Sequence, residues 1–471
     1  MNKNEVASYF DSIASQRDRW RKRSNFYHQD IIKLVNFLLP NNSSALVVGC
    51  STGDLLASLS KEGDKKGIDI SEKMVAIAKN KYPNLSFEKM DVENLEMTEK
   101  FDYLILSDVI GYLDDVQKAF NELLKVSHSK TKLVITYYNF LWEPILKLAE
   151  KIGLKMPEPI QNWLSEMDIK NILDLAGFEV VKNGSRMLLP MNIPLISPLF
   201  NRFLANTGIF RKLCLVNYLV ARPKPGLLPI KPNPSVTVLI PARNEKGNIE
   251  NAIKRLSPFG SHLEIIFVEG NSSDNTWEEI LRVKSAYPNL DIKAFKQVGK
   301  GKGDAVRTGF AQASGDILII LDADLTVRPE DLYKFYEAIS NGVAEFINGS
   351  RLVYQLEDQS MRLLNIFGNK FFSFMFSWLL GQYLKDTLCG TKVLWREDYI
   401  RIIEGRKYFG DFDPFGDFDL LFGAAKLNLK IVDLPIRYQA RTYGTTNISR
   451  FRHGLILLRM CLFAMKKIKF I

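Results

Sequence analysis

A proline-dense stretch at residues 223–234 divides this 471-residue sequence into two parts of similar length. Five prolines and one glycine lie within it, and such a composition continues neither a helix nor a central strand. On each side, short apolar runs alternate with helical patterns, which predicts α/β layers built on mainly parallel sheets. We therefore expect a domain at 1–222, a linker at 223–234, a domain at 235–450 and a tail at 451–471.

The first part places acidic residues at the ends of successive predicted strands. An apolar strand at 45–48 runs into the turn Gly49-Cys50-Ser51-Thr52-Gly53, and a helix follows from about residue 55. Glycines in such a turn let a ligand approach the backbone, and the helix N-terminus favours negative charge. Asp69 ends the next strand, about 20 residues after the turn, where an acid binds ribose hydroxyls. Asp91 and Asp108 end later strands at the same edge of the sheet.

This series of turn, acid, acid and strand resembles the class I S-adenosylmethionine-dependent methyltransferases over roughly residues 5–222. The resemblance extends to an entry helix with Tyr9-Phe10-Asp11 and Trp20, and to a last helix and strand at 162–181. It implies that Gly49 and Gly53 flank the methionine part of S-adenosylmethionine. It also implies that Asp69 holds the ribose, and that Asp91 with Val92 faces the adenine.

The same stretch departs from the family at two positions, and it leaves the methyl-transfer chemistry open. Val47 stands where the family often has an acid, and Ser51 where it often has glycine. Methyl transfer needs mainly proximity, with a base only for a hydroxyl acceptor, and Tyr27 and His28 are polar groups near the entry helix. No base is assigned, and a non-catalytic interaction domain is the alternative.

The second part again ends its strands in polar segments. The strand at 235–240 runs into Pro241-Ala242-Arg243-Asn244-Glu245, and the strand at 263–268 ends at Glu269. A glycine-rich segment at 299–309 carries Lys300, Lys302 and Arg307, which suits a pyrophosphate. The apolar run at 317–321 then delivers Asp322 and Asp324, and two such acids suit a hard divalent cation on a diphosphate.

This order resembles glycosyltransferase family 2, with the inverting GT-A fold, over about residues 235–450. The relatives it is most similar to are the dolichyl- and polyprenyl-phosphate sugar synthases, through Asn348-Gly349-Ser350-Arg351, the segment 386–392 and a closing loop at 441–446. The resemblance implies a nucleotide sugar as donor and Mg²⁺ or Mn²⁺ as the metal, held by Asp322 and Asp324. The residues that it places on the nucleotide sugar are Pro241, Ala242, Arg243, Glu245, Glu269, Lys302, Asp322, Arg351, Lys392 and Arg441.

Some positions differ from the family pattern. Glu269-Gly270 replaces the usual pair of aspartates, which leaves the choice of nucleobase open. Thr326 stands where many relatives place a metal-coordinating glutamine, and Thr391 stands where phenylalanine is usual.

The acceptor decides whether the second part needs a base. A sugar hydroxyl must lose a proton during attack, whereas a lipid phosphate is already an anion. Asp417 and Asp419 in the segment 416–419 are the candidate catalytic residues, and in a lipid-phosphate enzyme either could instead order the acceptor loop. Both a polyprenyl phosphate and a glycan hydroxyl stay open as acceptors.

Composition and patterning favour an anionic partner and a membrane surface. The sequence has 63 Lys and Arg against 53 Asp and Glu, a net charge of +10, which favours nucleotides and phospholipids. Four scattered cysteines indicate a reducing compartment, and neither a signal-peptide core nor an uncharged membrane-spanning run is seen. The segments 362–384 and 454–471 join apolar side chains to basic ones, as interfacial helices do.

Together these features predict a bifunctional enzyme, located in the cytoplasm and peripherally associated with the inner face of the membrane. We expect one domain to transfer a sugar to a polyprenyl phosphate, and the other to transfer a methyl group to a glycan- or lipid-related acceptor. The alternative is a polysaccharide-forming glycosyltransferase with a non-catalytic methyltransferase-like domain. Nucleic acid is not expected as a partner, because the basic cluster of the tail lies among bulky aliphatic residues.

Overall fold

A computed structural model describes residues 2–59, 62–353, 363–408, 416–439, 441, 443 and 450–470, with the backbone alone at 363–367 and 450–453. The chain divides into two compact units, described separately below. Unit 1 comprises Met1–Pro229 with Lys469–Ile471, and unit 2 comprises Ile230–Ile468.

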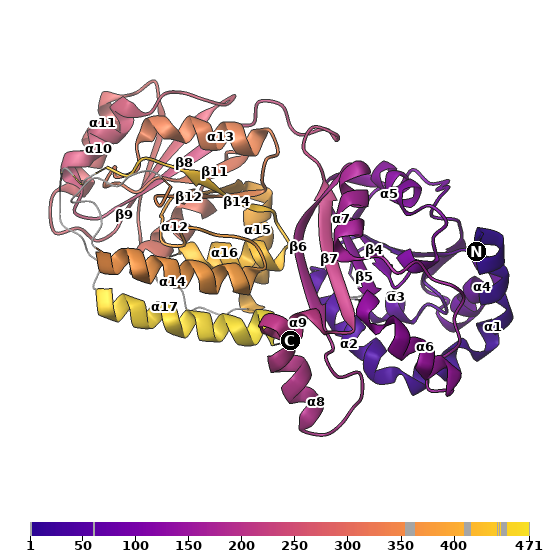
Figure 1. Ribbon diagram of the computed structural model, residues 1–471. Helices are drawn as coiled ribbons and strands as arrows, with labels where there is room; N and C mark the ends of the chain where they lie inside the picture. Colours follow the sequence, from indigo (N-terminus) through magenta and orange to yellow (C-terminus); the bar gives the residue numbers. More distant parts are fainter. Residues whose placement is uncertain are drawn as a thin grey trace. The chain divides into compact units, whose positions relative to one another are not determined.

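Unit 1 is built on a seven-stranded sheet in the order β3-β2-β1-β4-β5-β7-β6 (Figure 1). The strands are β1 (Ala45–Val48), β2 (Lys65–Asp69), β3 (Ser86–Lys89), β4 (Phe101–Ser107), β5 (Ser127–Tyr138), β6 (Phe178–Arg186) and β7 (Val216–Pro223). The first five are parallel, whereas β7 is antiparallel to both β5 and β6. The carboxyl ends of the parallel strands therefore meet at one edge of the sheet.

Helices cover both faces of this sheet. They are α1 (Lys3–Arg23), α2 (Asn25–Leu38), α3 (Asp54–Ser58), α4 (Glu72–Lys81), α5 (Val116–Lys125), α6 (Glu143–Lys151), α7 (Glu166–Leu175), α8 (Ile196–Pro198) and α9 (Gly208–Lys212). Short helical turns are η1 (Ile110–Tyr112), η2 (Phe140–Trp142), η3 (Leu199–Phe203) and η4 (Leu204–Asn206).

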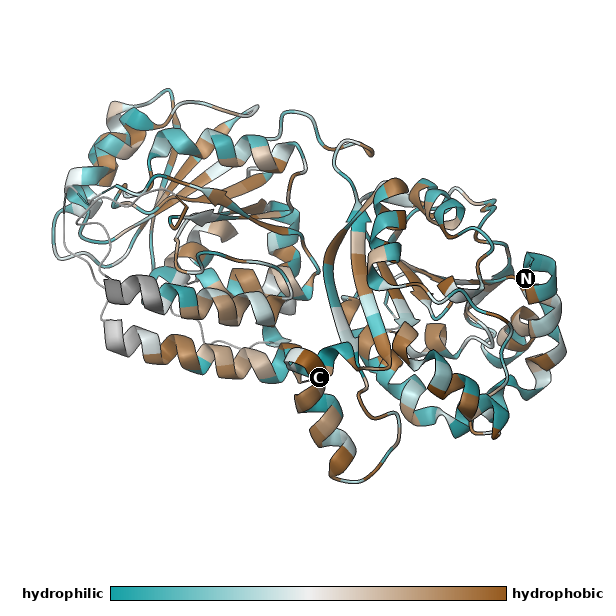
Figure 2. Ribbon diagram, in the orientation of Figure 1, coloured by the Kyte–Doolittle hydropathy of each residue, from teal (hydrophilic) through white to brown (hydrophobic). Residues whose placement is uncertain are grey.

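The strands of unit 1 form two cores because successive side chains point to opposite faces of a sheet. Leu46 and Val48 of β1 pack with Phe120 of α5 in one core. Ala45 and Val47 pack in the other, among residues of α2. Figure 2 shows the resulting hydrophobic strands between more polar helices. A strand buried on both faces reads as a continuous apolar run, which is why these strands are visible in the sequence.

Unit 2 contains a second seven-stranded sheet, in the order β10-β9-β8-β11-β13-β12-β14. The strands are β8 (Val236–Ala242), β9 (Leu263–Glu269), β10 (Asp291–Lys296), β11 (Ile317–Ile320), β12 (Phe346–Ser350), β13 (Lys392–Trp395) and β14 (Ile431–Pro435). β10, β9, β8 and β11 are parallel, β13 is antiparallel to both β11 and β12, and β12 is parallel to β14.

The helices of unit 2 lie in two layers (Figure 1). They are α10 (Ile249–Arg255), α11 (Thr276–Ala286), α12 (Lys302–Ala311), α13 (Leu332–Ser340), α14 (Leu363–Leu380), α15 (Arg396–Glu404), α16 (Asp417–Lys426) and α17 (Arg450–Ala464). Short helical turns are η5 (Lys246–Asn248), η6 (Pro329–Asp331), η7 (Gly405–Tyr408) and η8 (Met465–Lys469). The predicted fold class, with mainly parallel sheets in both parts, is confirmed.

The two segments expected at a membrane are partly core helices. Leu457, Met460 and Cys461 of α17 are buried in the core that also contains Phe376 of α14. The other side of α17 exposes apolar residues, among them Leu455 at 53% and Leu462 at 51%. In α14, Phe371 and Phe374 are exposed as well. Across the described residues, every helix is too short or too polar to cross a bilayer.

Candidate functional sites

A cavity of about 320 Å³ lies in unit 1 at the carboxyl ends of β1, β2 and β4. Its lining includes Gly49, Asp69, Asp91, Val92 and Asp108. Four of the five residues predicted to bind the cofactor therefore meet around one space. The fifth, Gly53, is not part of the lining. A cavity of this size, lined by both apolar and polar side chains, is typical of a small-molecule site.

The two glycines serve the turn between β1 and α3. Gly49 has φ +67°, and a Cβ there would lie 2.3 Å from Cγ2 of Val109. Gly53 has φ +88° at the N-cap of α3, and its Cβ would lie 2.8 Å from the ring of Phe87. Glycine is required at both positions because other residues rarely adopt this backbone and no room is left for a side chain.

Asp69 connects this turn to the end of β2. Its carboxylate accepts hydrogen bonds from the backbone N–H of Ser51 at 2.8 Å and of Ser71 at 2.9 Å. Burial raises the pKa of Asp69, while these two hydrogen bonds oppose that change. The side chain therefore positions the turn and presents a carboxylate to the cavity.

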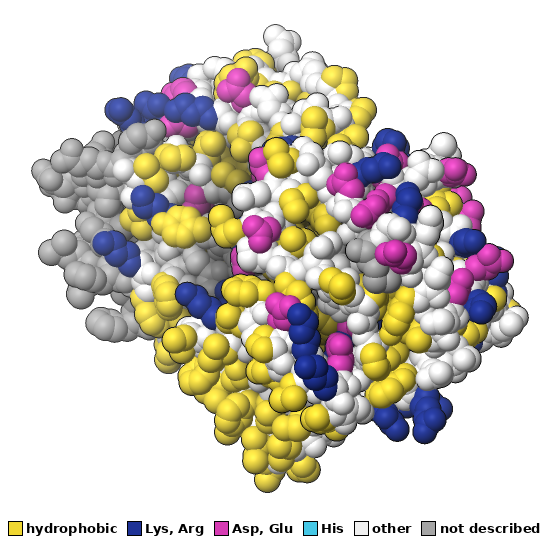
Figure 3. Space-filling model, turned by 45° about the vertical axis from the view of Figure 1, so that its right-hand side comes forward, with side chains coloured by type: hydrophobic (Ala, Val, Ile, Leu, Met, Phe, Trp, Pro, Cys, Tyr) yellow, Lys and Arg dark blue, Asp and Glu magenta, His cyan; other side chains and the backbone are white. Residues whose placement is uncertain are grey.

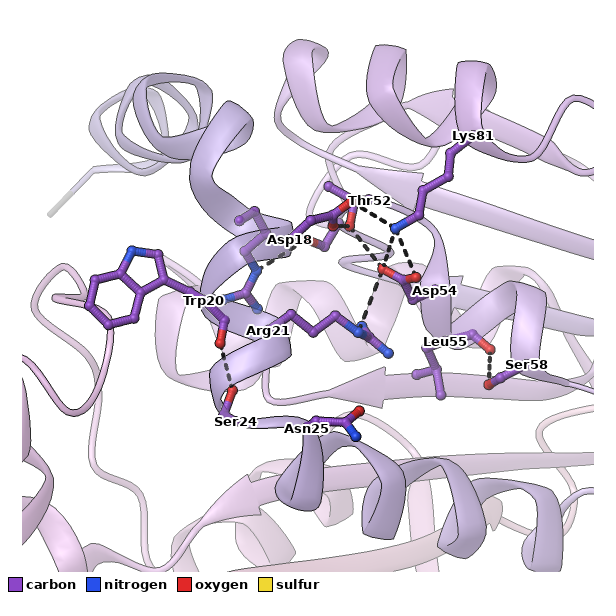
Figure 4. Close-up of polar contacts among 12 residues, drawn as sticks. Asp18, Trp20, Arg21, Ser24, Asn25, Thr52, Asp54, Leu55, Ser58 and Lys81 are labelled. Carbon is purple, nitrogen blue, oxygen red and sulfur yellow. Dashed lines mark hydrogen bonds and ion pairs between the residues drawn. The ribbon is translucent and has the colours of Figure 1, made fainter.

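Helix α1 is held against the site at both of its ends. Near its start, Lys3 Nζ lies 2.7 Å from Asp91 Oδ2. Near its end, Thr52 Oγ1 donates to Asp18 at 2.6 Å, and Lys81 binds both Asp18 and Asp54 (Figure 4). These contacts link α1 to the turn after β1 and to α4. The predicted entry helix thus contacts Asp91, a predicted cofactor residue, and Thr52 in the turn between Gly49 and Gly53.

A second group of polar side chains lies deeper in the cavity. Tyr27 Oη donates to Asp108 Oδ2 at 2.5 Å, and Thr136 Oγ1 donates to Asp108 Oδ1 at 3.0 Å. Burial raises the pKa of Asp108 although both hydrogen bonds act to lower it. Burial, with a smaller effect of Arg21, lowers the pKa of His28 to about 3, so this imidazole is neutral at pH 7. The Tyr27–Asp108 contact joins residues 81 positions apart, and no sequence signal indicated it.

In unit 2 the predicted acids meet where β8, β9 and β11 end. Arg441 joins two of them: its guanidinium is 3.1 Å from Glu245 Oε1 and 2.6 Å from Asp324 Oδ2. Burial raises the pKa of Glu245 to about 6, against the lowering effects of Asn248 and Arg441. The other oxygen of Asp324 accepts from the backbone N–H and the hydroxyl of Thr326. Thr326 therefore supports a candidate metal ligand in this structure.

Lys302 is the cation nearest to Asp322. It is the first residue of α12, and its Nζ lies 2.6 Å from Asp322 Oδ1 and 3.7 Å from Asp417 Oδ1. Burial would lower the pKa of Lys302, but the two carboxylates outweigh that effect and raise it. Gly390 closes the other side, since a Cβ there would lie 1.9 Å from Asp322 Oδ2.

Two further predicted cations are Lys392, which is buried, and Arg351, which is half-buried. Arg351 forms two hydrogen bonds with the buried carboxylate of Asp386, at 2.7 and 2.9 Å. Lys392 Nζ donates to the carbonyl oxygen of Cys389. Lys302 first, and then Lys392 and Arg351, hold the pKa of Asp322 below its usual range. The positive charge of all three thus reaches the predicted metal and phosphate site.

The predicted nucleoside residues lie along the ends of β8 and β9. Pro241 and Ala242 are the last residues of β8, and the carbonyl of Ala242 accepts from the N–H of Gly270 at 2.8 Å. Glu269 is buried and accepts from the N–H of Ser272 at 2.5 Å. The side chain of Arg243 is exposed. In the predicted closing loop, residues 442 and 444–446 lie outside the described residues.

Asp322 and Asp324 fit a divalent cation that takes its other ligands from the substrate. Among the described residues, three or more metal-binding side chains gather nowhere. Mg²⁺ is commonly bound by one or two carboxylates together with substrate phosphates and water. Asp322 and Asp324, beside Lys302 and Arg441, match that pattern. When a metal binds the two carboxylates, the side chains of Lys302 and Arg441 can pair with a diphosphate.

Two families match this chain, each over one unit. Residues 40–177 match the model of a methyltransferase domain, and residues 237–402 match glycosyl transferase family 2. Both predicted family resemblances are confirmed.

Curated relatives of this chain include proteins named as glycosyltransferases. A dolichol-phosphate mannosyltransferase of Pyrococcus furiosus is 41% identical over 120 residues, which cover 25% of this chain and 33% of the relative. The chain thus spans about a third of the length of that relative. A UDP-N-acetylglucosamine–dolichyl-phosphate N-acetylglucosaminyltransferase of Methanococcus voltae is 26% identical over 245 residues, covering 48% of this chain and 96% of the relative.

Solved structures that are similar to part of this chain include a methyltransferase. It is a SAM-dependent methyltransferase of Thermotoga maritima, 20% identical, with a TM-score of 0.37. The alignment covers 46% of this chain and 99% of that structure.

Proposed function

We propose that this chain, a methyltransferase domain joined to a glycosyltransferase family 2 domain, carries out two transfers. Unit 2 transfers a sugar from a nucleotide donor to a polyprenyl phosphate. Unit 1 transfers a methyl group from S-adenosylmethionine to a glycan- or lipid-related acceptor. Both reactions take place at the cytoplasmic face of a membrane.

One juxtaposition carries the sugar-transfer proposal: Lys302 beside Asp322, and Arg441 beside Asp324, at the end of one strand. A nucleoside diphosphate is the leaving group of this reaction, and its charge grows as the sugar departs. Two cations and two carboxylates that can bind Mg²⁺ or Mn²⁺ are suited to stabilise that charge. The relatives named for dolichyl-phosphate acceptors support the choice of acceptor.

In this reaction an acceptor oxygen attacks the anomeric carbon of the sugar from the side opposite the diphosphate. The new bond joins that carbon to the acceptor oxygen, and the bond to the β-phosphate oxygen breaks, so the configuration inverts. A divalent cation, when bound, would neutralise charge on the diphosphate. Lys302 and Arg441 bind oxygens of the diphosphate, while Glu245, Glu269 and Arg243 hold the nucleoside part.

The position of Asp417 keeps a second acceptor under consideration. Asp417 Oδ1 is 3.7 Å from Lys302 Nζ, so this carboxylate faces the reaction site. With a lipid phosphate, which has no proton to lose, Asp417 positions Lys302. With a sugar hydroxyl it would instead accept the proton of the attacking group.

The cavity of unit 1 supports the methyl-transfer proposal. In this proposal Asp69 accepts hydrogen bonds from the ribose hydroxyls, and Asp91 with Val92 contacts the adenine. The acceptor then occupies the region around Asp108, Tyr27 and His28. S-adenosylmethionine, when bound, would supply the methyl group to this acceptor.

The first experiment is a transfer assay with labelled GDP-mannose or UDP-glucose, Mg²⁺ and a polyprenyl phosphate. Label that enters the organic phase, and that disappears with Asp324→Ala, supports the sugar transfer. Donor binding without transfer would favour a hydroxyl acceptor. Calorimetry with S-adenosylmethionine tests the other half independently, and absence of binding would leave unit 1 as an interaction module.

A further inference from the structure

Unit 1 has an exposed apolar surface that the two proposed reactions do not use. None of the large hydrophobic side chains described between residues 2 and 139 is exposed. After that point, two segments expose them in numbers: α6 with its flanks, and residues 191–213. The change is abrupt, so the exposure belongs to these segments and is not a general property of the unit.

Helix α6 shows one apolar face to solvent. Ile145, Leu148 and Ile152 follow each other at spacings of three and four, and their exposed fractions are 53%, 58% and 61%. Residues at this spacing lie on the same side of a helix. No residue of α6 is fully buried. Its most apolar side is therefore turned away from the core.

The second segment is a loop with a hydrophobic tip. All six residues from 191 to 196 are exposed, and Leu195 reaches 88%. Ile196 and Leu199 continue the apolar surface along α8 and η3. Figure 3 shows hydrophobic side chains gathered over the lower end of the molecule, where α8 lies in Figure 1. We call Ile145, Leu148, Ile152, Leu195, Ile196 and Leu199 the apolar platform.

The charge of the loop segment favours a negatively charged partner. Residues 187–215 contain Arg202, Arg211 and Lys212 and no acidic residue. Bulky aliphatic side chains with basic neighbours are typical of a surface that enters the headgroup region of an anionic bilayer.

The platform adjoins the mouth of the cavity. The antiparallel pairing of β5 and β7 sets Tyr138 beside Val216. The segment that leads to α6 therefore begins, and the segment 191–213 ends, at the same end of the sheet. Trp142 Nε1 donates to the carbonyl of Leu213 at 2.9 Å. The cavity lining includes Leu146 of α6 and Pro190, just before the loop. The same two segments thus form the cavity wall on one side and the apolar surface on the other.

We propose that the apolar platform docks unit 1 on an anionic lipid bilayer, and that its methyl acceptor is lipid-linked and enters the cavity between α6 and Pro190. None of the platform residues belongs to the segments 362–384 and 454–471, although Arg202 and Phe203 of the same loop segment contact Phe470. The docking part stands on the surface itself, whereas the acceptor part rests on the proposed methyl transfer.

A local probe tests the docking in the full chain. All four cysteines of the protein are buried, so Leu195→Cys can be labelled selectively with an environment-sensitive fluorophore. We expect a blue shift on addition of vesicles of phosphatidylcholine and phosphatidylglycerol, but not of phosphatidylcholine alone. Asn80→Cys on α4, also exposed, should show none. Vesicle binding without a shift at residue 195, or an equal shift on neutral vesicles, would overturn the proposal.

Charged substitutions test it a second way. Ile196→Asp with Leu199→Asp should lower partitioning onto these vesicles by at least about tenfold, because two aliphatic side chains leave the bilayer. Leu281→Asp with Val343→Asp, at exposed positions of unit 2, should leave it unchanged. Equal binding by both double variants would contradict the platform as the docking surface.

Methyl-transfer assays test separately whether the methyl acceptor is lipid-linked. The Ile196→Asp, Leu199→Asp variant should bind S-adenosylmethionine as the wild type does, because neither residue lines the cavity. It should lose methyl transfer to a lipid-linked sugar in vesicles and retain it when detergent disperses the same acceptor. Equal activity of the wild type on a water-soluble sugar would overturn a lipid-linked acceptor. Failure to bind S-adenosylmethionine would instead reject the proposed methyl transfer and leave the probe result intact.

Discussion

Asp417 and Asp419 lie two residues apart on α16, and their carboxylates bind different partners. Asp417 Oδ1 is 3.7 Å from Lys302 Nζ, beside Asp322. Asp419 Oδ2 is 3.2 Å from Arg406 Nε and 3.7 Å from a guanidinium nitrogen of Arg307. Residues at this spacing do not share a face of a helix. Of the two, Asp417 is therefore the one that lies beside the proposed sugar-transfer site.

We expect Asp417→Asn to lower sugar transfer more than Asp419→Asn, by at least about tenfold, because only the first change alters the surroundings of Lys302. Asp419→Asn should mainly reduce stability, by about 1–3 kcal/mol, since it weakens the pairs with two arginines. Steady-state kinetics and thermal unfolding of both variants check this. A loss above about 100-fold for Asp417→Asn alone would indicate a hydroxyl acceptor; equal kinetic losses would contradict the assignment.

Asp324→Asn should lower sugar transfer by at least about 100-fold, because it removes a carboxylate from the metal and changes the partner of Arg441. In the wild type, EDTA should abolish transfer and Mg²⁺ or Mn²⁺ should restore it. Glu330→Gln, an acid of the same region that is 46% exposed, is the matched control and should be neutral. Full activity in EDTA would reject metal dependence.

Gly390→Ala should reduce sugar transfer strongly without unfolding unit 2. The added Cβ would lie 1.9 Å from Asp322 Oδ2 and 2.4 Å from Lys302 Nζ, so this pair must separate. At Gly405 nothing lies within 4 Å of an added Cβ, and Gly405→Ala should be neutral. The readout is kcat with circular dichroism as the folding check. Wild-type kcat for Gly390→Ala would show that the Asp322–Lys302 contact is dispensable.

Asp69→Asn should weaken binding of S-adenosylmethionine by about ten- to a hundredfold, because hydrogen bonds to a charged acceptor contribute about 1.5–3 kcal/mol. Asp64→Asn, at an exposed acid just before β2, is the control. Isothermal titration calorimetry measures both affinities. Unchanged affinity for Asp69→Asn would move the ribose contact to another residue of the cavity.

The ligand-free protein should lose stability on acidification partly through His28. Burial lowers the pKa of His28 from 6.5 to about 3. The unfolded chain therefore takes up a proton below pH 6.5 that the folded chain does not, and stability falls as pH falls through that range. Between pH 6.5 and 5 this effect amounts to at most about 2 kcal/mol. Urea unfolding at several pH values should show that the free energy of unfolding falls more steeply with falling pH in the wild type than in His28→Gln. The same pH dependence in both proteins would contradict a buried neutral imidazole.

Several features of this protein are determined by the sequence alone. The apolar runs at 45–48 and 317–321, and the glycine turn after the first, are local signals, since burial on both faces and left-handed φ angles act on a few consecutive residues. Parallel strands also bring their carboxyl ends to one edge. For that reason the sequence predicts that Glu245, Asp322 and Asp324 lie close together at one edge of the sheet.

Only the tertiary structure decided which charges meet. Lys302 could be predicted in a loop, yet its partner Asp322 is brought to it by the packing of α12 against the sheet. Arg351 was expected at phosphates, and the fold pairs it with Asp386, 35 residues away. The apolar platform could not be predicted for the same reason, because a hydrophobic residue looks the same in the sequence whether it is buried or exposed. Ion pairing and burial depend on distances in space, which local patterning does not encode.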